Sequence, residues 1–390
     1  PYDVVNREEA RQIGEKNQLS FLHVDRAEMD LEPDIDLYDE RVYDKARENL
    51  QNMEKEGILI QDDTPCYYIY ELVRKGRTQS GIVGCSSIDD YMNGIVKKHE
   101  LTREDKEQDR IHHVDSCNAN TGPIFLACRY PQSLLALMER WKAEHPAAYD
   151  FTEEDEVAHR VWVIDAPEVT AQICEEFAGI DSLYIADGHH RAASAVKVGL
   201  KRREENPGFT GKEEFNFFLS VVFPYDQLCI LPYNRVVKDL NGLTVKAFLG
   251  ALKFNFELML MPGFPCKPVE KHCMGMYVDG QWYHLKAWQD VYDKKDVVEQ
   301  LDVSILQDKV LSPVLGIKDP RTDQRISFVG GNHKAAELAR MADQTGGVAF
   351  VMYPTSMEDL MQIADEGRLM PPKSTWFEPK LRSGLFIHKL

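Results

Sequence analysis

SLYIADGHHRA, residues 182–192, is the stretch of sequence that decides the fold. Its apolar first half, Ser182–Ala186, predicts a short buried strand. The next five residues, 187–191, read as a turn, and the Ala-, Val- and Leu-rich run Ala192–Lys201 predicts a helix. Gly188 permits a sharp turn and a close approach of the backbone to a ligand. A strand, a tight turn and a helix therefore follow one another within twenty residues.

This arrangement favours an anion-binding site. The N–H groups and the dipole of a helix's first turn attract negative charge. Arg191 adds a planar fork suited to bidentate phosphate contact, and His189 and His190 add further donors. Asp187 could hold a metal ion, orient a histidine or bind a substrate ammonium. The plainer interpretation is that Asp187 caps the helix and one histidine is a buried donor; phosphate binding is the interpretation we favour.

A second candidate residue is Glu100, which follows Lys97, Lys98 and His99. A carboxylate among such neighbours stays ionised and can accept a proton from a hydroxyl. The alternative is an ordinary exposed charge cluster before the helix predicted over residues 102–115, with Thr102 as its N-cap. The catalytic interpretation requires the fold to bring Glu100 close to Asp187.

A third candidate is the C-terminal pair of segments MPPKST, residues 370–375, and KLRSG, residues 380–384. Lys373 and Thr375 follow a stiff Pro-Pro pair and could reach a phosphate. A solvated C-terminal loop explains the same residues equally well.

Composition excludes several classes of protein. With 46 Lys and Arg against 64 Asp and Glu, the net charge of −18 repels phosphodiester backbones, so no nucleic-acid partner is predicted. Apolar stretches such as residues 217–223 are much shorter than the ~20 residues of a membrane helix, so no membrane partner is predicted. The eight cysteines lack CxxC spacing and the first residues do not resemble a signal peptide, which predicts reduced thiols and a cytoplasmic location. A Walker phosphate loop, GxGxxG, GxSxG and HExxH are all missing.

The alternation of strands and helices predicts an α/β or α+β class, and we expect an α+β protein of two parts. Residues 66–73 and 81–85 predict a β-hairpin, and residues 229–237 a further strand. From about Thr244 the composition changes, so the boundary is expected at 240–245. The predicted domains are residues 1–243 and residues 244–390, the second an α/β domain.

Several segments together resemble the DUF1015 family over essentially the whole chain. They are PYDVV at 1–5, KHE at 98–100, YIADGHHRA at 184–192, ILP at 230–232, Asn234-Arg235 and the MPPKST…PKLRSG tail. The DGHHR turn also resembles the signature of the ParB/sulfiredoxin-like superfamily. That superfamily includes the free L-serine kinases of archaea and of a staphylococcal siderophore pathway. Those kinases resemble this chain at a His-Glu pair ahead of a helix and at the DGHHR turn.

The resemblance implies a Mg²⁺-dependent transfer of a phosphoryl group from ATP or ADP to the hydroxyl of free L-serine, giving O-phosphoserine. Carried over by position, Glu100 is the general base, Asp187 holds the serine or the metal ion, and His190 joins them as a catalytic residue. The phosphate or nucleotide is expected at Gly188, His189, His190 and Arg191, with Lys373 and Thr375 from the tail. The implied fold is a ParB/sulfiredoxin-like core with insertions in residues 1–243. A homodimer is left open. Asp187 lies 87 positions after Glu100, more than in the small kinases, so an insertion must fold between them.

Three other functions are weighed against the kinase. A ParB-like module would bind a nucleotide as a regulatory switch without kinase activity. A metabolite-binding protein that has lost its catalytic base would behave similarly. A sulfiredoxin-like reductase is excluded because it needs a nucleophilic cysteine beside the His-Arg pair, and the nearest cysteine in sequence is Cys174.

Overall fold

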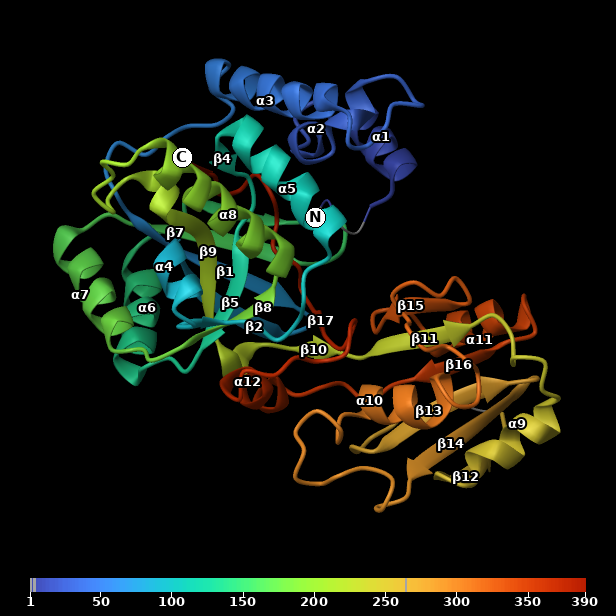
Figure 1. Cartoon of the computed structure of the whole chain (residues 1–390). Helices are drawn as coiled ribbons and strands as arrows, with labels where there is room; N and C mark the ends of the chain where they lie inside the picture. Colours follow the sequence, from blue (N-terminus) through green and yellow to red (C-terminus); the bar gives the residue numbers. More distant parts are fainter. Residues whose placement is uncertain (1, 3–4, 264) are drawn as a thin grey trace. The chain divides into compact units, whose positions relative to one another are not determined.

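The computed structural model describes residue 2, residues 5–263 and residues 265–390 (Figure 1). Helices and strands are mixed in an α+β arrangement, and the chain forms two compact units. The first unit contains residues 1–98, 102–228 and 379–390, and the second contains residues 99–101 and 229–378. Pro1, Asp3 and Val4, which belong to the first segment resembling the family, lie outside the described residues.

The first unit is built on a mixed eight-stranded sheet in the order β3-β8-β5-β9-β2-β1-β7-β6. The neighbours β3–β8 and β5–β9 run parallel, and the other neighbours run antiparallel. The strands are β1 (Tyr67–Arg74), β2 (Arg77–Ser87), β3 (Val96–Lys97), β5 (Ile124–Cys128), β6 (Tyr149–Thr152), β7 (Ala158–Ile164), β8 (Leu183–Asp187) and β9 (Phe217–Pro224). This sheet contains the segment SLYIA as β8, so the predicted buried strand lies between β3 and β5.

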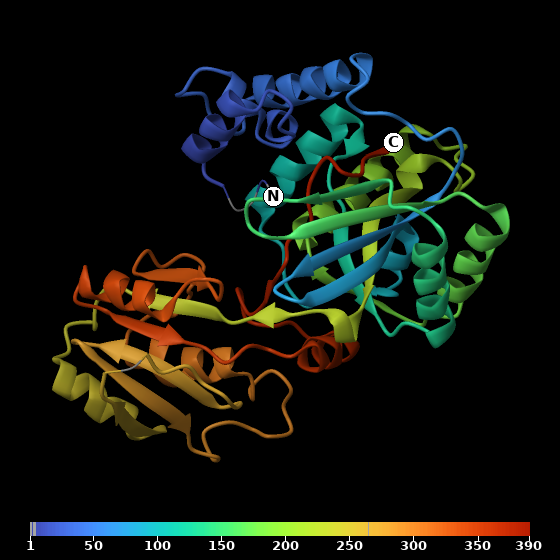
Figure 2. The same ribbon diagram turned by 180° about the vertical axis from the view of Figure 1, so that it is seen from behind.

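Helices cover one face of this sheet (Figures 1 and 2). Side chains of α4 and α8 pack on the half formed by β8, β5 and β9, and those of α6 and α7 pack on β1, β2 and β7. Helix α5 lies against α8, and α3 packs on α5. The helices and helical turns of this unit are α1 (Arg7–Lys16), α2 (Leu22–Asp25), η2 (Ala27–Asp30), α3 (Glu40–Lys55), α4 (Ile88–Met92), α5 (Glu104–Cys117), α6 (Gln132–Glu144), α7 (Pro167–Ala178), α8 (His189–Glu205), η3 (Glu214–Asn216) and η4 (Tyr225–Gln227).

The predicted hairpin is formed by β1 and β2, which pair from Tyr68↔Val83 to Arg74↔Arg77. Its loop is the dipeptide Lys75-Gly76, with φ of 50° and 77°. Two-residue hairpin loops of type I′ need positive φ at both positions because their twist then matches that of the strands. Strand β1 therefore ends at Arg74 and β2 begins at Arg77, both closer to the turn than the predicted ranges 66–73 and 81–85.

Aromatic side chains cover the opposite face of the sheet. Phe125 and Phe223 pack with ring centroids 4.8 Å apart, and Tyr70 packs on Phe386 of the C-terminal segment at 5.4 Å. A short strand in that segment, β18 (His388–Lys389), pairs with β4 (Ala119–Asn120). These contacts are why the last twelve residues fold with the first unit.

The second unit has a six-stranded sheet in the order β12-β14-β13-β16-β11-β15 and a separate two-stranded pair, β10–β17. One core packs α11 against the sheet through Leu338, Ala349 and Val236. The elements are β10 (Ile230–Leu231), β11 (Tyr233–Val237), α9 (Val245–Leu252), β12 (Phe256–Met261), β13 (Cys273–Val278), β14 (Gln281–Ala287), α10 (Asp302–Leu306), the π-helical turn η5 (Gln307–Leu311), β15 (Ile326–Gly330), α11 (Ala335–Asp343), β16 (Val348–Val351), α12 (Met357–Asp365) and β17 (Trp376–Phe377).

Two predicted boundaries differ from the structure. The chain passes from the first unit to the second after Leu228, not at 240–245, because β11 pairs with β15 and β16 of the second unit. The composition change near Thr244 marks the start of α9 inside that unit. The predicted strand over residues 229–237 is divided into β10 and β11 at Pro232, which has no N–H to donate to a ladder.

Helix α5 also starts differently from the prediction. Its N-cap is Arg103 rather than Thr102, and the Thr102 hydroxyl instead donates to the Glu107 carboxylate at 2.5 Å. Among the described residues, no helix is long and apolar enough to cross a membrane.

The packing of α8 on the sheet generates a stability prediction. A Cβ added at Gly199 would lie 2.4 Å from the Phe215 carbonyl oxygen and 2.8 Å from Ile88 Cδ1. We expect Gly199→Ala to lower the free energy of unfolding by about 1–3 kcal/mol, although alanine favours a helix by about 1 kcal/mol. Gly250→Ala in α9 is the matched control, since nothing lies within 4 Å of its added Cβ. Urea unfolding curves measure both; equal effects of the two variants would contradict the packing argument.

Candidate anion-binding site

The site begins where β8 ends. Gly188 has φ 94° and ψ 32°, in the left-handed region, and is the N-cap of α8. The first intrahelical hydrogen bond runs from the Ala192 N–H to the Gly188 carbonyl at 2.9 Å. Neither a side-chain cap nor an acidic residue occupies this first turn. A glycine cap without a side chain leaves the positive end of the helix dipole accessible to an anion.

The helix starts earlier than the sequence predicts. His189, His190 and Arg191, expected in a turn before the helix, form its first turn. Gly188 is the reason, because its positive φ reverses the chain direction in a single residue. The two histidines and the arginine therefore have fixed helical directions.

Asp187, the last residue of β8, faces two cations. Its Oδ1 lies 3.2 Å from the Lys380 ammonium, and its Oδ2 lies 3.4 Å from Arg191 Nη2. Burial raises the pKa of this carboxyl, but Lys380 and Arg191 outweigh that effect and lower the pKa to about 2. Asp187 is thus ionised, and its predicted role as a metal ligand stays a prediction that two adjacent cations disfavour.

Lys380 is a functional candidate in the KLRSG segment, and the sequence predicted no partner for it. It belongs to the C-terminal segment of the first unit, with a side chain only 14% exposed. The only signal in the sequence was its place in the KLRSG segment, and 193 positions separate it from Asp187.

Arg191 is held from two sides. Its Nη1 donates to the Pro123 carbonyl at 2.9 Å, and its Nη2 contacts Asp187. A Cβ at position 188 would lie 3.0 Å from Arg191 Nε and Nη2. Gly188 is therefore needed both for the backbone turn and for the space that the guanidinium occupies.

His190 connects α8 to the chain that enters α5. Its Nε2 accepts a hydrogen bond from the Arg103 N–H at 2.9 Å. Because Nε2 is the acceptor, the neutral ring carries its proton on Nδ1. His190 therefore positions the loop between β3 and α5 beside the first turn of α8.

The tripeptide His99–Leu101 lies in this loop. It is grouped with the second unit, but the residues on both sides of it belong to the first. Lys97 of β3 pairs with Tyr184 of β8, and Arg103 is bonded to His190. The tripeptide is thus joined at both ends to residues of the first unit, and the closeness of Glu100 to Asp187 that the catalytic interpretation requires stays a prediction.

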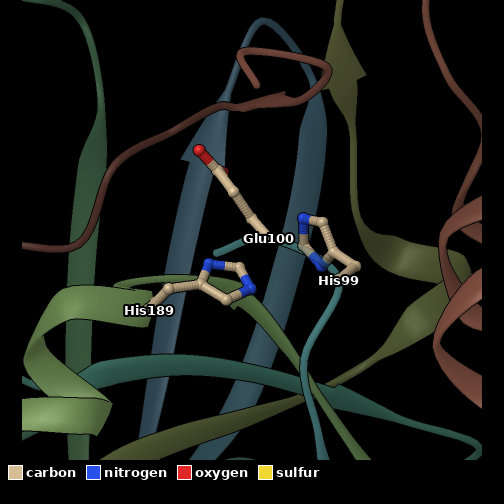
Figure 3. Close-up of side chains that lie close together, drawn as sticks. All are labelled: His99, Glu100 and His189. Atoms are coloured by element: carbon tan, nitrogen blue, oxygen red, sulfur yellow. The ribbon is translucent and has the colours of Figure 1, made fainter. Parts of the chain in front are cut away.

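Figure 3 draws His99 and Glu100 of this loop together with His189 of α8. Each offers a potential ligand atom, and these atoms all lie within 4.8 Å of one another. His99 and His189 are buried, and Glu100 is half-buried. Two imidazoles and one carboxylate are donors typical of zinc, iron or manganese. Mg²⁺ prefers oxygen ligands and usually combines one or two carboxylates with substrate phosphates.

The remaining predicted nucleotide ligands, Lys373 and Thr375, lie in the second unit just before β17. The Lys373 ammonium lies 5.6 Å from the centre of the Tyr233 ring. The backbone carbonyl of Lys373 accepts a hydrogen bond from Arg235 Nη2 at 3.1 Å. Their predicted role at the DGHHR site stays a prediction.

The fold and site define a class: an α+β protein in which a glycine-capped helix, an arginine and a neighbouring carboxylate form a candidate anion-binding site. Within that class, the chain belongs to the DUF1015 family, described as a protein of unknown function, whose family model matches residues 1–304. This confirms the family resemblance seen in the sequence for residues 1–304, and the tail segments at 370–384 lie beyond the matched range. No curated protein matches the chain.

Three solved structures illustrate the structural likeness. A free serine kinase in complex with AMP is 15% identical, with a TM-score of 0.38, covering 76% of this chain and 86% of that chain. SbnI with a C-terminal truncation, from Staphylococcus aureus, is 11% identical, with a TM-score of 0.40 and coverages of 78% and 87%. A conserved hypothetical protein from Pyrococcus furiosus is 15% identical, with a TM-score of 0.37 and coverages of 77% and 93%. At these scores the likeness assigns no activity to the chain.

The ion pairs of Asp187 predict a contribution to acid stability. A carboxyl whose pKa is about 2 when folded and 3.8 ordinarily stabilises the fold above pH 3.8, and this contribution is lost as the pH falls toward 2. Between about pH 4.5 and 3, wild type should therefore lose about 1 kcal/mol more unfolding free energy than Asp187→Asn.

Urea unfolding at several pH values measures this difference. Asp226→Asn, which removes an exposed carboxylate of the same unit, is the control and should follow wild type. Parallel pH dependence of wild type and Asp187→Asn would contradict the role of Lys380 and Arg191.

Proposed function

We propose that this protein is a nucleotide-dependent kinase that phosphorylates the hydroxyl of free L-serine, with ATP or ADP as donor. The observation that supports the proposal is the hydrogen bond from the Arg103 N–H to His190, which joins the loop of Glu100 to the helix start that bears Arg191. In this proposal Glu100 is the proton acceptor and the helix start is the anion site, and phosphoryl transfer to an alcohol needs both.

Glu100 acts as the general base in this proposal. Its carboxylate takes the proton of the serine hydroxyl as the hydroxyl oxygen forms a bond to the terminal phosphorus of the nucleotide. The bond from that phosphorus to the bridging oxygen breaks, and the electron pair leaves with the shortened nucleotide. The products are O-phosphoserine and a nucleotide with one phosphate fewer, so atoms and charge balance.

The start of α8 and Arg191 hold the transferring phosphoryl group. Phosphoryl transfer depends mainly on positioning and on stabilising charge on the phosphate oxygens. The helix dipole and the Arg191 fork supply positive potential at one place, and Lys380 adds a second cation beside it. Asp187 keeps these two cations in place, which makes it a positioning residue in this proposal.

Mg²⁺ would neutralise phosphate oxygens when bound. The residues fit it only where the nucleotide supplies most of the ligands, since Glu100 is the one oxygen donor in its cluster with His99 and His189.

All eight cysteines are free thiols, which supports the cytoplasmic location we predict for the reaction.

The first test is a phosphoryl-transfer assay with free L-serine, Mg²⁺ and either ATP or ADP, followed by ³¹P NMR for O-phosphoserine. We expect product from wild type, and a loss of about 100- to 10,000-fold in kcat for Glu100→Gln, because glutamine cannot accept the proton. Glu104→Gln removes the same charge from an exposed position four residues further on and should leave kcat unchanged.

The outcomes separate the alternatives. Equal kcat for wild type and Glu100→Gln would keep the kinase and move the base elsewhere. Nucleotide binding without product from either donor would overturn the kinase and favour the regulatory nucleotide-binding module.

The anion site has its own prediction. Arg191→Lys keeps the charge but removes the planar fork, so we expect nucleotide affinity to fall about tenfold or more. Arg140→Lys, at an exposed position of α6, should leave the affinity as in wild type. Isothermal titration with ADP and ATP measures both, and an unchanged Kd for Arg191→Lys would remove Arg191 from the phosphate site.

A further inference from the structure

A second polar feature of the first unit shares Arg191 with the anion site. It is a small pocket whose lining includes side chains from α2, α5, α8 and the C-terminal segment. The polar and charged groups that concern us are Asp25, Arg110, His113, Thr121, Arg191 and Ser383. Since Arg191 also contacts Asp187, the pocket and the anion site adjoin each other.

Asp25 is the unusual member of the pocket. The residue is only 4% exposed, yet it is a carboxylate at the end of α2. Its Oδ1 accepts from the Thr121 hydroxyl at 2.9 Å, whereas its buried Oδ2 has no hydrogen-bond partner among the described residues. A buried carboxylate oxygen without a donor is costly, so such an oxygen is a natural receptor for a ligand N–H.

Two arginines supply the opposite charge. The Arg110 side chain is 13% exposed and donates to Asp109 Oδ2 through Nη2 at 2.9 Å and Nε at 3.1 Å. Burial opposes its charge, but Tyr2, Asp109 and Asp25 raise its pKa above the ordinary value, so it stays charged. Arg191 is the second guanidinium of the lining.

His113 adds no charge to the pocket. Its Nε2 donates to the Val24 carbonyl at 3.0 Å, and burial together with Arg110 lowers its pKa. The charged groups of the lining are therefore one carboxylate and two guanidinium groups, and each guanidinium also contacts a carboxylate outside the lining, Asp109 for Arg110 and Asp187 for Arg191. A ligand that carries only negative charge would be repelled by Asp25, and a ligand that carries only positive charge would be repelled by Arg110 and Arg191.

We propose that this pocket binds the ammonium and carboxylate groups of a free α-amino acid, with the ammonium on Asp25 Oδ2 and the carboxylate facing the two arginines. A zwitterion is the small ligand class whose two charges match both signs of the lining at once. The inference deepens the proposed function and rests on it only for the hydroxyl that is phosphorylated. It makes Asp25 a specificity-determining residue.

The test is binding of three probes to the full chain without nucleotide, measured by isothermal titration. L-Serine carries both charged groups, 3-hydroxypropionate lacks the ammonium, and ethanolamine lacks the carboxylate. For wild type we expect L-serine to bind about 30-fold or more tightly than either analogue, because each analogue leaves a buried charge unpaired. This comparison needs no variant, so it holds whatever a substitution does to folding.

Asp25→Asn then identifies the receptor. Asparagine keeps the shape but not the charge, so the affinity for L-serine should fall to near that for 3-hydroxypropionate, while nucleotide affinity stays as in wild type. Asp34→Asn, an exposed carboxylate of the same N-terminal segment, should keep the wild-type preference.

Each outcome bears on one proposal. Equal affinity of wild type for the three probes, or an unchanged preference in a folded Asp25→Asn, would overturn the amino-acid pocket. A clear serine preference that depends on Asp25, without any O-phosphoserine formed, would keep the pocket and overturn the kinase.

Discussion

The left-handed backbone of Gly188 is the constraint on which the site depends. Because the chain reverses in one residue, β8 and α8 meet without a loop, and Asp187 and Arg191 come within ion-pair distance. The glycine also leaves the space that the Arg191 guanidinium fills. A longer connection would separate the acid from the cations and turn the first helical turn away from the sheet edge. The electrostatics of the site thus follow from a backbone conformation that an L side chain rarely adopts.

Local patterns in the sequence were sufficient to predict the elements but not their long-range partners. The strand, glycine and helix around DGHHR and the hairpin were predictable because turn residues and apolar runs act over a few residues. Lys380 and Asp25 could not be assigned partners, since the contacts with Asp187 and Thr121 join segments far apart in the chain. The boundary at Leu228 was missed because the apolar run over residues 228–231 crosses it without a change in composition.

The surroundings of α8 separate two kinds of polar side chain. One kind is fixed by protein partners: Asp187 by two cations, His190 by a backbone amide, and Arg191 by a backbone carbonyl. The other kind, represented by Asp25 Oδ2, is buried with an acceptor capacity that the described residues leave unused. Preorganised groups of the first kind lose little freedom on binding a ligand, which is the general requirement for a site that stabilises charge during a reaction.

The place of Lys380 has a consequence for synthesis on the ribosome. The chain of the second unit is inserted between Leu228 and Pro379 of the first. Strand β18 and Lys380, one of the two counter-ions of Asp187, are therefore translated after residues 229–378, and the Asn118 amide donates to the Leu390 carbonyl at 2.5 Å. A nascent first unit therefore holds an ionised, half-assembled site until the segment with Lys380 has been made. Completion of the site is thereby coupled to synthesis of the whole second unit, because residues 229–378 must be translated before Lys380.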